Sequence, residues 1–178
     1  LTLLGVIDAD LGLQGSDLRA AERTFQLMRQ VAGRAGRVET PGEALLQTYQ
    51  PEHPVIQAIL SGDDEGFWAA EAREREAAGV PPYGRFVGII LSSTDAAQAF
   101  DAGNQLARND GALRDIGAQV FGPAPAPIAR VRGRHRVRLL VKAARGAALQ
   151  PAIARWVSQI QIKGQLRLAV DIDPQTFY

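Results

Sequence analysis

The sequence predicts an α/β chain built in two parts. Over residues 1–62, short apolar runs alternate with amphipathic runs at helical spacing, which is the alternation of an α/β sheet. Residues 63–84 are a charged helical stretch that a proline pair ends, so they connect the two parts. Residues 85–178 follow the order strand, helix, strand, strand, helix, strand. That order is typical of the split βαβ, or ferredoxin-like, α+β fold.

Composition places the chain among folded globular proteins and excludes several classes. Of its 178 residues, 46% are hydrophobic, which is enough for a packed core and too many for a disordered chain. No apolar run approaches the roughly 20 residues of a membrane span. The sequence has no cysteine, which excludes disulfides and thiolate metal sites and fits a reducing compartment. Because the net charge is only +1, any surface for nucleic acid must be a local basic patch.

The first part contains two predicted strands. Leu1 to Ile7 is a dense apolar run, which predicts a buried parallel strand. We expect further chain ahead of it, because a protein does not usually begin inside its core. Asp8 and Asp10 end this strand, and two acids without a third ligand favour structural roles over metal binding. The second strand is predicted from Glu43 to Tyr49.

Helices are predicted before and after the second strand. Apolar residues recur at helical spacing from Leu18 to Val31, and Asp17 is placed to cap the first turn. A short helix is predicted from Pro54 to Leu60, with His53 at its start. The charged stretch from Asp63 to Gly79 predicts a helix with one solvated face of mixed charge.

The segment from Gln30 to Arg37 reads Gln-Val-Ala-Gly-Arg-Ala-Gly-Arg and follows the end of the long helix. Arg34 and Arg37 are three residues apart on a backbone that Gly33 and Gly36 make flexible. Two guanidiniums so placed can converge on a phosphoryl group and stabilise the charge that develops during its transfer. The alternative is that both arginines only complement the helix dipole and the last carbonyls. Taken alone, the residues favour that alternative.

In the second part, strands are predicted over residues 86–92, 119–122, 137–143 and 166–172. Helices are predicted over residues 95–109 and 147–160. The proline-rich residues 123–127 follow the second of these strands. In this arrangement two helices cover one face of an antiparallel sheet, and the other face is free to bind a partner.

Five arginines occupy every second position of one stretch: Arg130, Arg132, Arg134, Arg136 and Arg138. On a continuous strand all five would point to one side, and such a row would hold DNA phosphates without reading base sequence. Gly133 could instead form a turn that divides the row into the solvated arginines of a hairpin. Both interpretations stay open from the sequence. No aromatic residue accompanies the row, which argues against base stacking there.

A resemblance decides between the interpretations of the first arginine pair. Gln30, Gly33, Arg34 and Arg37 match the last conserved motif (Gln-x-x-Gly-Arg-x-x-Arg) of superfamily 2 helicases. The flanking sequence is similar to the replication-restart helicases of the primosomal protein N′ family, through Asp17, Arg19, Ala20, Glu22, Arg23, Thr24, Phe25 and Gln26. The segments Gly122-Pro123-Ala124-Pro125 and Ile172-Asp173-Pro174-Gln175 are similar to that family as well. The resemblance covers essentially the whole chain.

This resemblance implies a fold and an activity. Residues 1–62 would be the end of a RecA-like helicase lobe, residues 63–84 a connecting helix, and residues 85–178 a C-terminal domain. The whole protein would be a cytoplasmic, ATP-dependent 3′–5′ DNA helicase that restarts stalled forks through primosome assembly. It would use ATP and Mg²⁺, with Arg34 and Arg37 catalytic and Gln30 and Gly33 beside them at the nucleotide. The zinc sites of the family would lie upstream of this chain. The chain has no phosphate-loop motif, so it would not hydrolyse ATP by itself.

The resemblance also implies partners. These are branched and single-stranded DNA, other primosome proteins and the acidic tail of single-stranded DNA-binding protein, with no membrane. In the family, the tail contact involves an arginine and a glutamine near the start of the last helix. Gln150 matches the glutamine, whereas Gly146 stands at the arginine position and leaves neighbouring Arg145 as the substitute. The alternative function is a stand-alone DNA- or protein-binding module without an ATP role, and a third interpretation gives both arginine groups structural roles.

Overall fold

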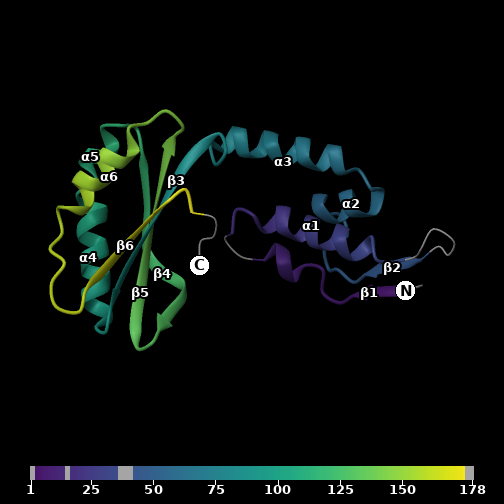
Figure 1. The fold of residues 1–178 in the computed structure, drawn as a ribbon, viewed down its shortest axis with the longest axis horizontal. Helices are drawn as coiled ribbons and strands as arrows, with labels where there is room; N and C mark the ends of the chain where they lie inside the picture. Colours follow the sequence, from purple (N-terminus) through teal and green to yellow (C-terminus); the bar gives the residue numbers. More distant parts are fainter. Residues whose placement is uncertain (1–2, 15–16, 36–41, 175–178) are drawn as a thin grey trace. The chain divides into compact units, whose positions relative to one another are not determined.

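The computed structural model describes residues 3–14, 17–35 and 42–174, and Figure 1 shows its helices and strands. The chain divides into two compact units, unit 1 (residues 1–73) and unit 2 (residues 74–178). The division falls inside α3 (Asp64–Ala78), the helix predicted over Asp63–Gly79. None of the described helices has the length and apolarity that a membrane crossing needs.

Unit 1 alternates strands and helices, as the sequence predicts. Strands β1 (Leu3–Val6) and β2 (Glu43–Leu46) pair in parallel, with α1 (Ala20–Ala32) between them in the chain. A 3-10 turn, η1 (Leu11–Leu13), precedes α1, and α2 (Pro54–Ser61) follows β2. The connection from β1 through α1 to β2 has the form of a βαβ unit, which parallel strands require.

The long helix of unit 1 begins two residues later than predicted. It starts at Ala20, and the Asp17 side chain does not cap it. Instead, Asp17 Oδ1 accepts the Arg19 N–H at 3.0 Å in the turn that leads into the helix. Asp17 Oδ2 also forms an ion pair with Arg23 at 2.7 Å. The carboxylate predicted to cap the helix therefore holds the turn before it.

The core of unit 1 contains side chains from α1, α2 and α3. Phe25 of α1 stacks on Phe67 of α3 with ring centroids 3.9 Å apart, and Trp68 meets both rings edge-on. The other buried members of this cluster are Ala9, Met28, Val55, Ile56 and Ile59. Aromatic stacking thus joins the first and third helices of the unit.

The two strands of unit 1 bury only one of their faces. Val6 and Leu46 pack against the core cluster. On the other face, Leu3 and Leu45 are 56% and 61% exposed. Because side chains alternate along a strand, this second face, which also carries Glu43, is exposed within the described part of unit 1.

Unit 2 holds a four-stranded antiparallel sheet in the order β4-β5-β3-β6. Its strands are β3 (Gly84–Ser93), β4 (Gln119–Val131), β5 (Arg134–Ala144) and β6 (Arg167–Ile172). The helices α4 (Ala96–Arg108), α5 (Gly111–Arg114) and α6 (Leu149–Val157) lie on one side of the sheet (Figure 1). The predicted order of elements is present, and the short α5 is added to it.

The core of unit 2 lies between the sheet and its helices. Alternate residues of the two central strands are buried there: Val87, Ile89, Leu91, Val137, Leu139 and Val141. Trp156 of α6 is fully buried, and its indole N–H donates to the Leu106 carbonyl of α4 at 2.9 Å. This hydrogen bond satisfies the one polar group of a large buried ring.

Strand β4 is longer than the sequence predicts. The proline-rich residues were expected to follow its end at Gly122, whereas the strand continues to Val131. Proline is tolerated because β4 is an edge strand that pairs only with β5. The register shifts between Phe121 and Ala124, and again between Pro125 and Arg130. The ladder is therefore interrupted where several prolines lie.

We expect Gly84→Ala to destabilise unit 2. A Cβ at this position would overlap the Gly79 carbonyl oxygen and lie 3.2 Å from the Ala143 carbonyl oxygen, and these backbone atoms cannot turn aside. Overpacking of this kind costs about 1–3 kcal/mol, so the urea midpoint should fall. Gly111→Ala is the control, because nothing lies within 4 Å of its added carbon. Equal midpoints for the two variants would contradict the prediction.

Candidate functional site

The predicted phosphate-contacting motif of unit 1 begins in the last turn of α1. The helix ends at Ala32, and Gly33 continues with right-handed angles at φ −64°. Gln30 and Arg34 are exposed. The Arg34 side chain makes no hydrogen bond or ion pair with the part of the chain that the structure describes. Arg37 lies outside the described residues, so the convergence of the two arginines stays a prediction.

A buried carboxylate joins the loops that follow β1 and β2. Asp10 accepts the Thr48 hydroxyl at 2.5 Å and the Tyr49 backbone N–H at 2.6 Å. The Thr48 hydroxyl contributes most to lowering the pKa of Asp10, followed by the Tyr49 N–H; burial opposes this shift and nearby His53 adds to it. Strand β2 ends at Leu46, short of the predicted Tyr49, and the Tyr49 N–H donates to Asp10.

His53 has a structural contact at the start of α2, where the sequence places it. Its Nδ1 accepts the Val55 N–H at 3.2 Å, and Pro54 follows it at the first helical position. Within residues 3–14, 17–35 and 42–174, no group of three His, Asp or Glu residues could hold a metal ion. Asp10 and His53 follow the carboxyl ends of β1 and β2. Arg34 instead follows the end of α1, the helix that returns the chain from the end of β1 to the start of the parallel strand β2. The structure therefore does not bring Arg34 together with Asp10.

The five alternating arginines of unit 2 do not lie on one strand. Arg132 (φ 49°) and Gly133 (φ 77°) form the two-residue turn between β4 and β5. Arg130 lies on β4, opposite His135 of β5. The turn at Gly133 is thus present and the continuous row is not. Arg134, Arg136 and Arg138 remain together on β5.

We call the face of the unit 2 sheet that lies opposite α4, α5 and α6 the open face. Cationic side chains from several strands lie on it. On β5, Arg136 and Arg138 alternate with buried Val137 and Leu139, so they point to the open face. Directly opposite residues of antiparallel strands share a face. The pairs of Ser92 with Arg136 and with Arg167 therefore place Arg167 there too. By this register the described cations of the open face are Arg134, Arg136, Arg138, Lys142 and Arg167, and the described acid of β6 on that face is Asp171.

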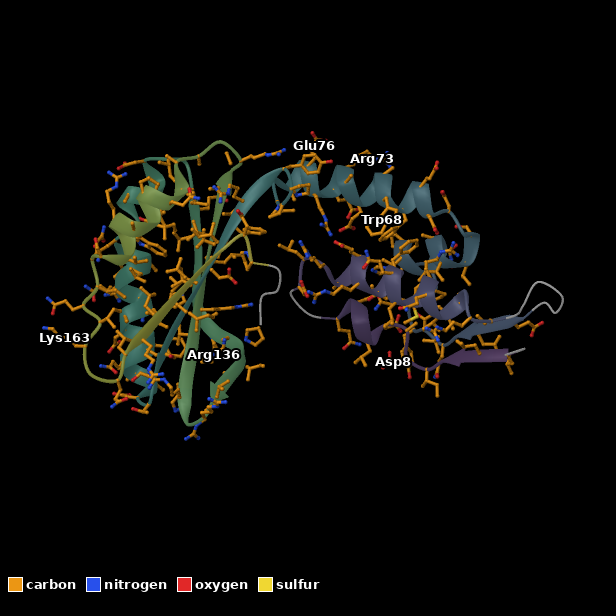
Figure 2. The ribbon with its side chains drawn as sticks, in the orientation of Figure 1. Asp8, Trp68, Arg73, Glu76, Arg136 and Lys163 are labelled. Atoms are coloured by element: carbon orange, nitrogen blue, oxygen red, sulfur yellow. The ribbon has the colours of Figure 1, made fainter. Side chains whose placement is uncertain are left out.

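Neighbouring backbone holds some of these cations in place. The Arg134 guanidinium donates to the carbonyls of Ser92 (2.8 Å) and Gln165. Arg136, labelled in Figure 2, reaches the Ile128 carbonyl at 3.5 Å. Among the described residues, no carboxylate forms an ion pair with either arginine. Their charge is therefore not neutralised by the described acids, and a surface of this kind attracts polyanions.

Arg145 and Gln150 are exposed on either side of the start of α6. Arg145 lies in the turn after β5, and Gln150 is the second residue of the helix. Gly146, between them, has open space where a side chain would begin. The two predicted partner-binding residues are accessible, and their role stays a prediction.

The sequence does not identify Phe121 as a member of the open face. Phe121 of β4 lies opposite Leu140 of β5 and is 48% exposed. If β4 and β5 paired without interruption from the turn at Arg132 and Gly133, Phe121 would lie opposite Ala144. The two register shifts in β4 change this partner to Leu140, and the sequence does not reveal them. The turn is the signal that could have shown an aromatic residue on the strand beside the arginines.

Fold and site together define a two-unit α/β protein whose second unit has a helix-covered face and an open basic face suited to a polyanion. The family described as "Primosomal protein N C-terminal domain" matches residues 76–175. The chain belongs to this family, which confirms the resemblance found in the sequence.

Curated relatives carry the name replication restart protein PriA. The Rickettsia conorii protein is 38% identical over the full 178 residues of this chain, which correspond to 27% of the relative's length. The Treponema pallidum protein is 36% identical over 98% of this chain, which corresponds to 26% of that protein's length. The Bacillus subtilis protein is 34% identical over 98% of this chain, which corresponds to 22% of its length. The chain thus spans about a quarter of the length of the relatives it matches.

We expect Asp10→Asn to remove a pH-dependent contribution to stability. The Thr48 and Tyr49 donors hold the folded pKa of Asp10 below its ordinary value of 3.8. A carboxylate with a depressed pKa stabilises the folded state above its unfolded pKa, and this stabilisation is lost as pH falls through the folded pKa. The variant's deficit in urea midpoint should be largest near neutral pH and should shrink below pH 3.8.

Asp101→Asn, at an exposed position of α4, is the matched control for this experiment. Its urea midpoint should follow that of the parent at each pH. A deficit for Asp10→Asn that stays constant from neutral pH to about pH 2 would show that the loss comes from packing and not from the charge of Asp10.

Proposed function

We propose that the chain is the C-terminal part of an ATP-dependent DNA helicase of replication restart, in which unit 2 holds DNA and unit 1 supplies arginines to the nucleotide. The family match and the names of the relatives support this assignment. The observation that carries the DNA-binding role is the open face of unit 2. Its described cations outnumber its described acid, and Arg136 has no carboxylate partner among the described residues.

The open face suits contacts with phosphate and not with base edges. Arg136 and Arg167 lie in one row across three strands, each opposite Ser92, so their Cα atoms are about 10 Å apart at a strand spacing of roughly 4.8 Å. Guanidiniums spread over a sheet can bind separate phosphates of one backbone, which gives affinity without sequence information. The proposed ligands are branched and single-stranded DNA.

The finer fold assignments follow from the same proposal. Unit 2 is the ferredoxin-like C-terminal domain, which its element and strand orders support. Unit 1 is the end of a RecA-like motor lobe. The exposed Leu3 and Leu45 on one face of its sheet support this, because a parallel sheet is usually covered on both faces. The rest of the lobe would provide that cover in the longer relatives.

In this proposal, the motif at the end of α1 contacts the nucleotide. ATP with Mg²⁺ would supply the transferred phosphoryl group, and Arg34 and Arg37 would stabilise its developing charge, with Gln30 and Gly33 beside them. The exposed guanidinium of Arg34, without a partner among the described residues, fits this role. The family's zinc sites would lie outside this chain, and Arg145 with Gln150 would take the acidic tail of single-stranded DNA-binding protein.

A stand-alone binding module is the second candidate function. Unit 2 favours it, because its core is closed by its own helices and includes fully buried Trp156. In that case unit 2 would bind DNA or a protein partner, and Arg34 and Arg37 would have no part in ATP hydrolysis.

We expect the purified chain to show no DNA-stimulated ATP hydrolysis, because its sequence has no phosphate loop to hold the nucleotide. In a full-length protein containing this chain, Arg37→Ala should lower kcat by on the order of 10²–10³-fold with a smaller change in KM, because a transition-state contact is lost. Arg73→Ala, at an exposed position of α3, is the matched control. Unchanged kcat in Arg37→Ala would support the stand-alone module.

We expect the open face to set the salt dependence of DNA binding. The triple variant Arg136→Gln, Lys142→Gln, Arg167→Gln should reduce the slope of log K against log salt by roughly 0.9 per lost duplex contact. The control triple removes the same charge from the helix-covered side, through Arg108→Gln, Arg155→Gln and Lys163→Gln. Titration of fork DNA at several salt concentrations measures both slopes. If the two triples behave alike, the DNA contact lies elsewhere.

A further inference from the structure

We propose that Phe121 is a base-stacking residue, so that the open face of unit 2 binds unpaired nucleic-acid strands in preference to duplex. This inference rests on the proposed DNA-binding role of that face and names its ligand class. Phe121 lies on β4 opposite Leu140, on the face away from the helices, and is 48% exposed. Its neighbour Val120 packs against the core on the other face, which fixes the direction of the ring.

Phe121 is 48% exposed, and its ring forms no aromatic pair within the described part of the chain. The ring contacts of the described residues that involve Phe25, Phe67 and Trp68 all belong to unit 1, and Phe121 makes none. A single exposed apolar residue needs no functional explanation by itself. Phe121 differs because of the charges that surround it on the same face.

Two cations flank the ring on the neighbouring strand. Lys142 and Arg138 lie two residues to either side of Leu140, the residue opposite Phe121. Such diagonal neighbours have Cα atoms about 7–8 Å apart, which long side chains can cover. Ala124, opposite Arg138, adds little bulk on that side of the ring. A base stacked on Phe121 would therefore have a cation within reach of the phosphate on each side.

The backbone next to Phe121 is built around a glycine. Gly122 has φ 100°, and a Cβ there would lie 2.8 Å from the Arg138 carbonyl oxygen. The register shift that begins after Phe121 is a β-bulge, and bulges at sheet edges redirect side chains. This local geometry leaves the ring on the open face at the edge of the sheet.

Stacking on an aromatic side chain selects unpaired strands. In a duplex both faces of each base are covered by neighbouring bases, whereas an unstacked base offers a free face. An acidic peptide would also meet the cations of the open face. Spaced cations around a flat exposed ring match a strand that alternates phosphates and bases, so we assign nucleic acid as the ligand of this face. Binding of an acidic peptide instead is an outcome that the experiment distinguishes.

The experiment measures binding of the full chain to three fluorescent probes at one salt concentration. The probes are an oligothymidylate, an abasic oligomer of the same length and a duplex. Phe121→Leu should weaken oligothymidylate binding by roughly 5- to 100-fold, the usual loss for one stacked base, and should change binding of the abasic and duplex probes less than about twofold. Ile128→Ala, which removes a 52% exposed apolar side chain from the same strand, is the control and should change none of them.

A second variant keeps a ring at the position. Phe121→Trp should retain affinity for oligothymidylate, and its fluorescence should be quenched by that probe and not by the abasic oligomer. Oligothymidylate binding equal to the parent in Phe121→Leu, or equal losses on all three probes, would overturn the stacking role. If an oligoglutamate of matched charge loses affinity in Phe121→Leu while oligothymidylate does not, the ligand is an acidic peptide. If the Arg136, Lys142 and Arg167 triple variant leaves every probe unaffected, the proposed DNA-binding face fails, whatever Phe121 does.

Discussion

The alternation of buried and exposed residues along β5 is the constraint on which unit 2 depends. Val137, Leu139 and Val141 are buried under the helices, so the residues between them must point to the opposite face. A register slip of one residue would turn arginines into the core, where unpaired charge is very costly. Burial of apolar surface on one face therefore orients the cations on the other. The helices occupy one side of the sheet, and the basic residues lie on the other side (Figure 1).

In unit 1, buried and exposed residues also alternate along the strands, but the described residues cover only one face of the sheet. Its parallel strands bury Val6 and Leu46 and leave Leu3 and Leu45 exposed. Its helices are nevertheless well joined, because Phe25 and Phe67 stack and Asp10 ties the loops after both strands. The unit thus has a packed helical side and a sheet face with exposed leucines that no described residue covers. That asymmetry is the observation behind the proposal that unit 1 is part of a larger lobe.

Backbone geometry decides how the charges of unit 2 are distributed. Arg132 and Gly133 adopt left-handed angles, which reverse the chain and divide the alternating arginines between two strands. The two register shifts in β4 place Phe121 opposite Leu140, so that Lys142 is a diagonal neighbour. An edge strand accepts these interruptions because one side of its ladder has no partner. The turn and the register shifts together distribute the arginines over a two-dimensional surface, with an aromatic ring at its edge.

The sequence by itself determined the order of elements and the family, because these depend on local spacing and on short motifs. It also located the exposed motif residues Gln30 and Arg34 at the end of a helix. The tertiary structure alone decided which cations share a face, since Arg167 joins Arg136 only through pairing across β3. It also decided that β4 continues past its prolines and that Phe121 lies on the open face. Register shifts and cross-strand pairing depend on contacts between residues distant in the chain, and no local pattern records them.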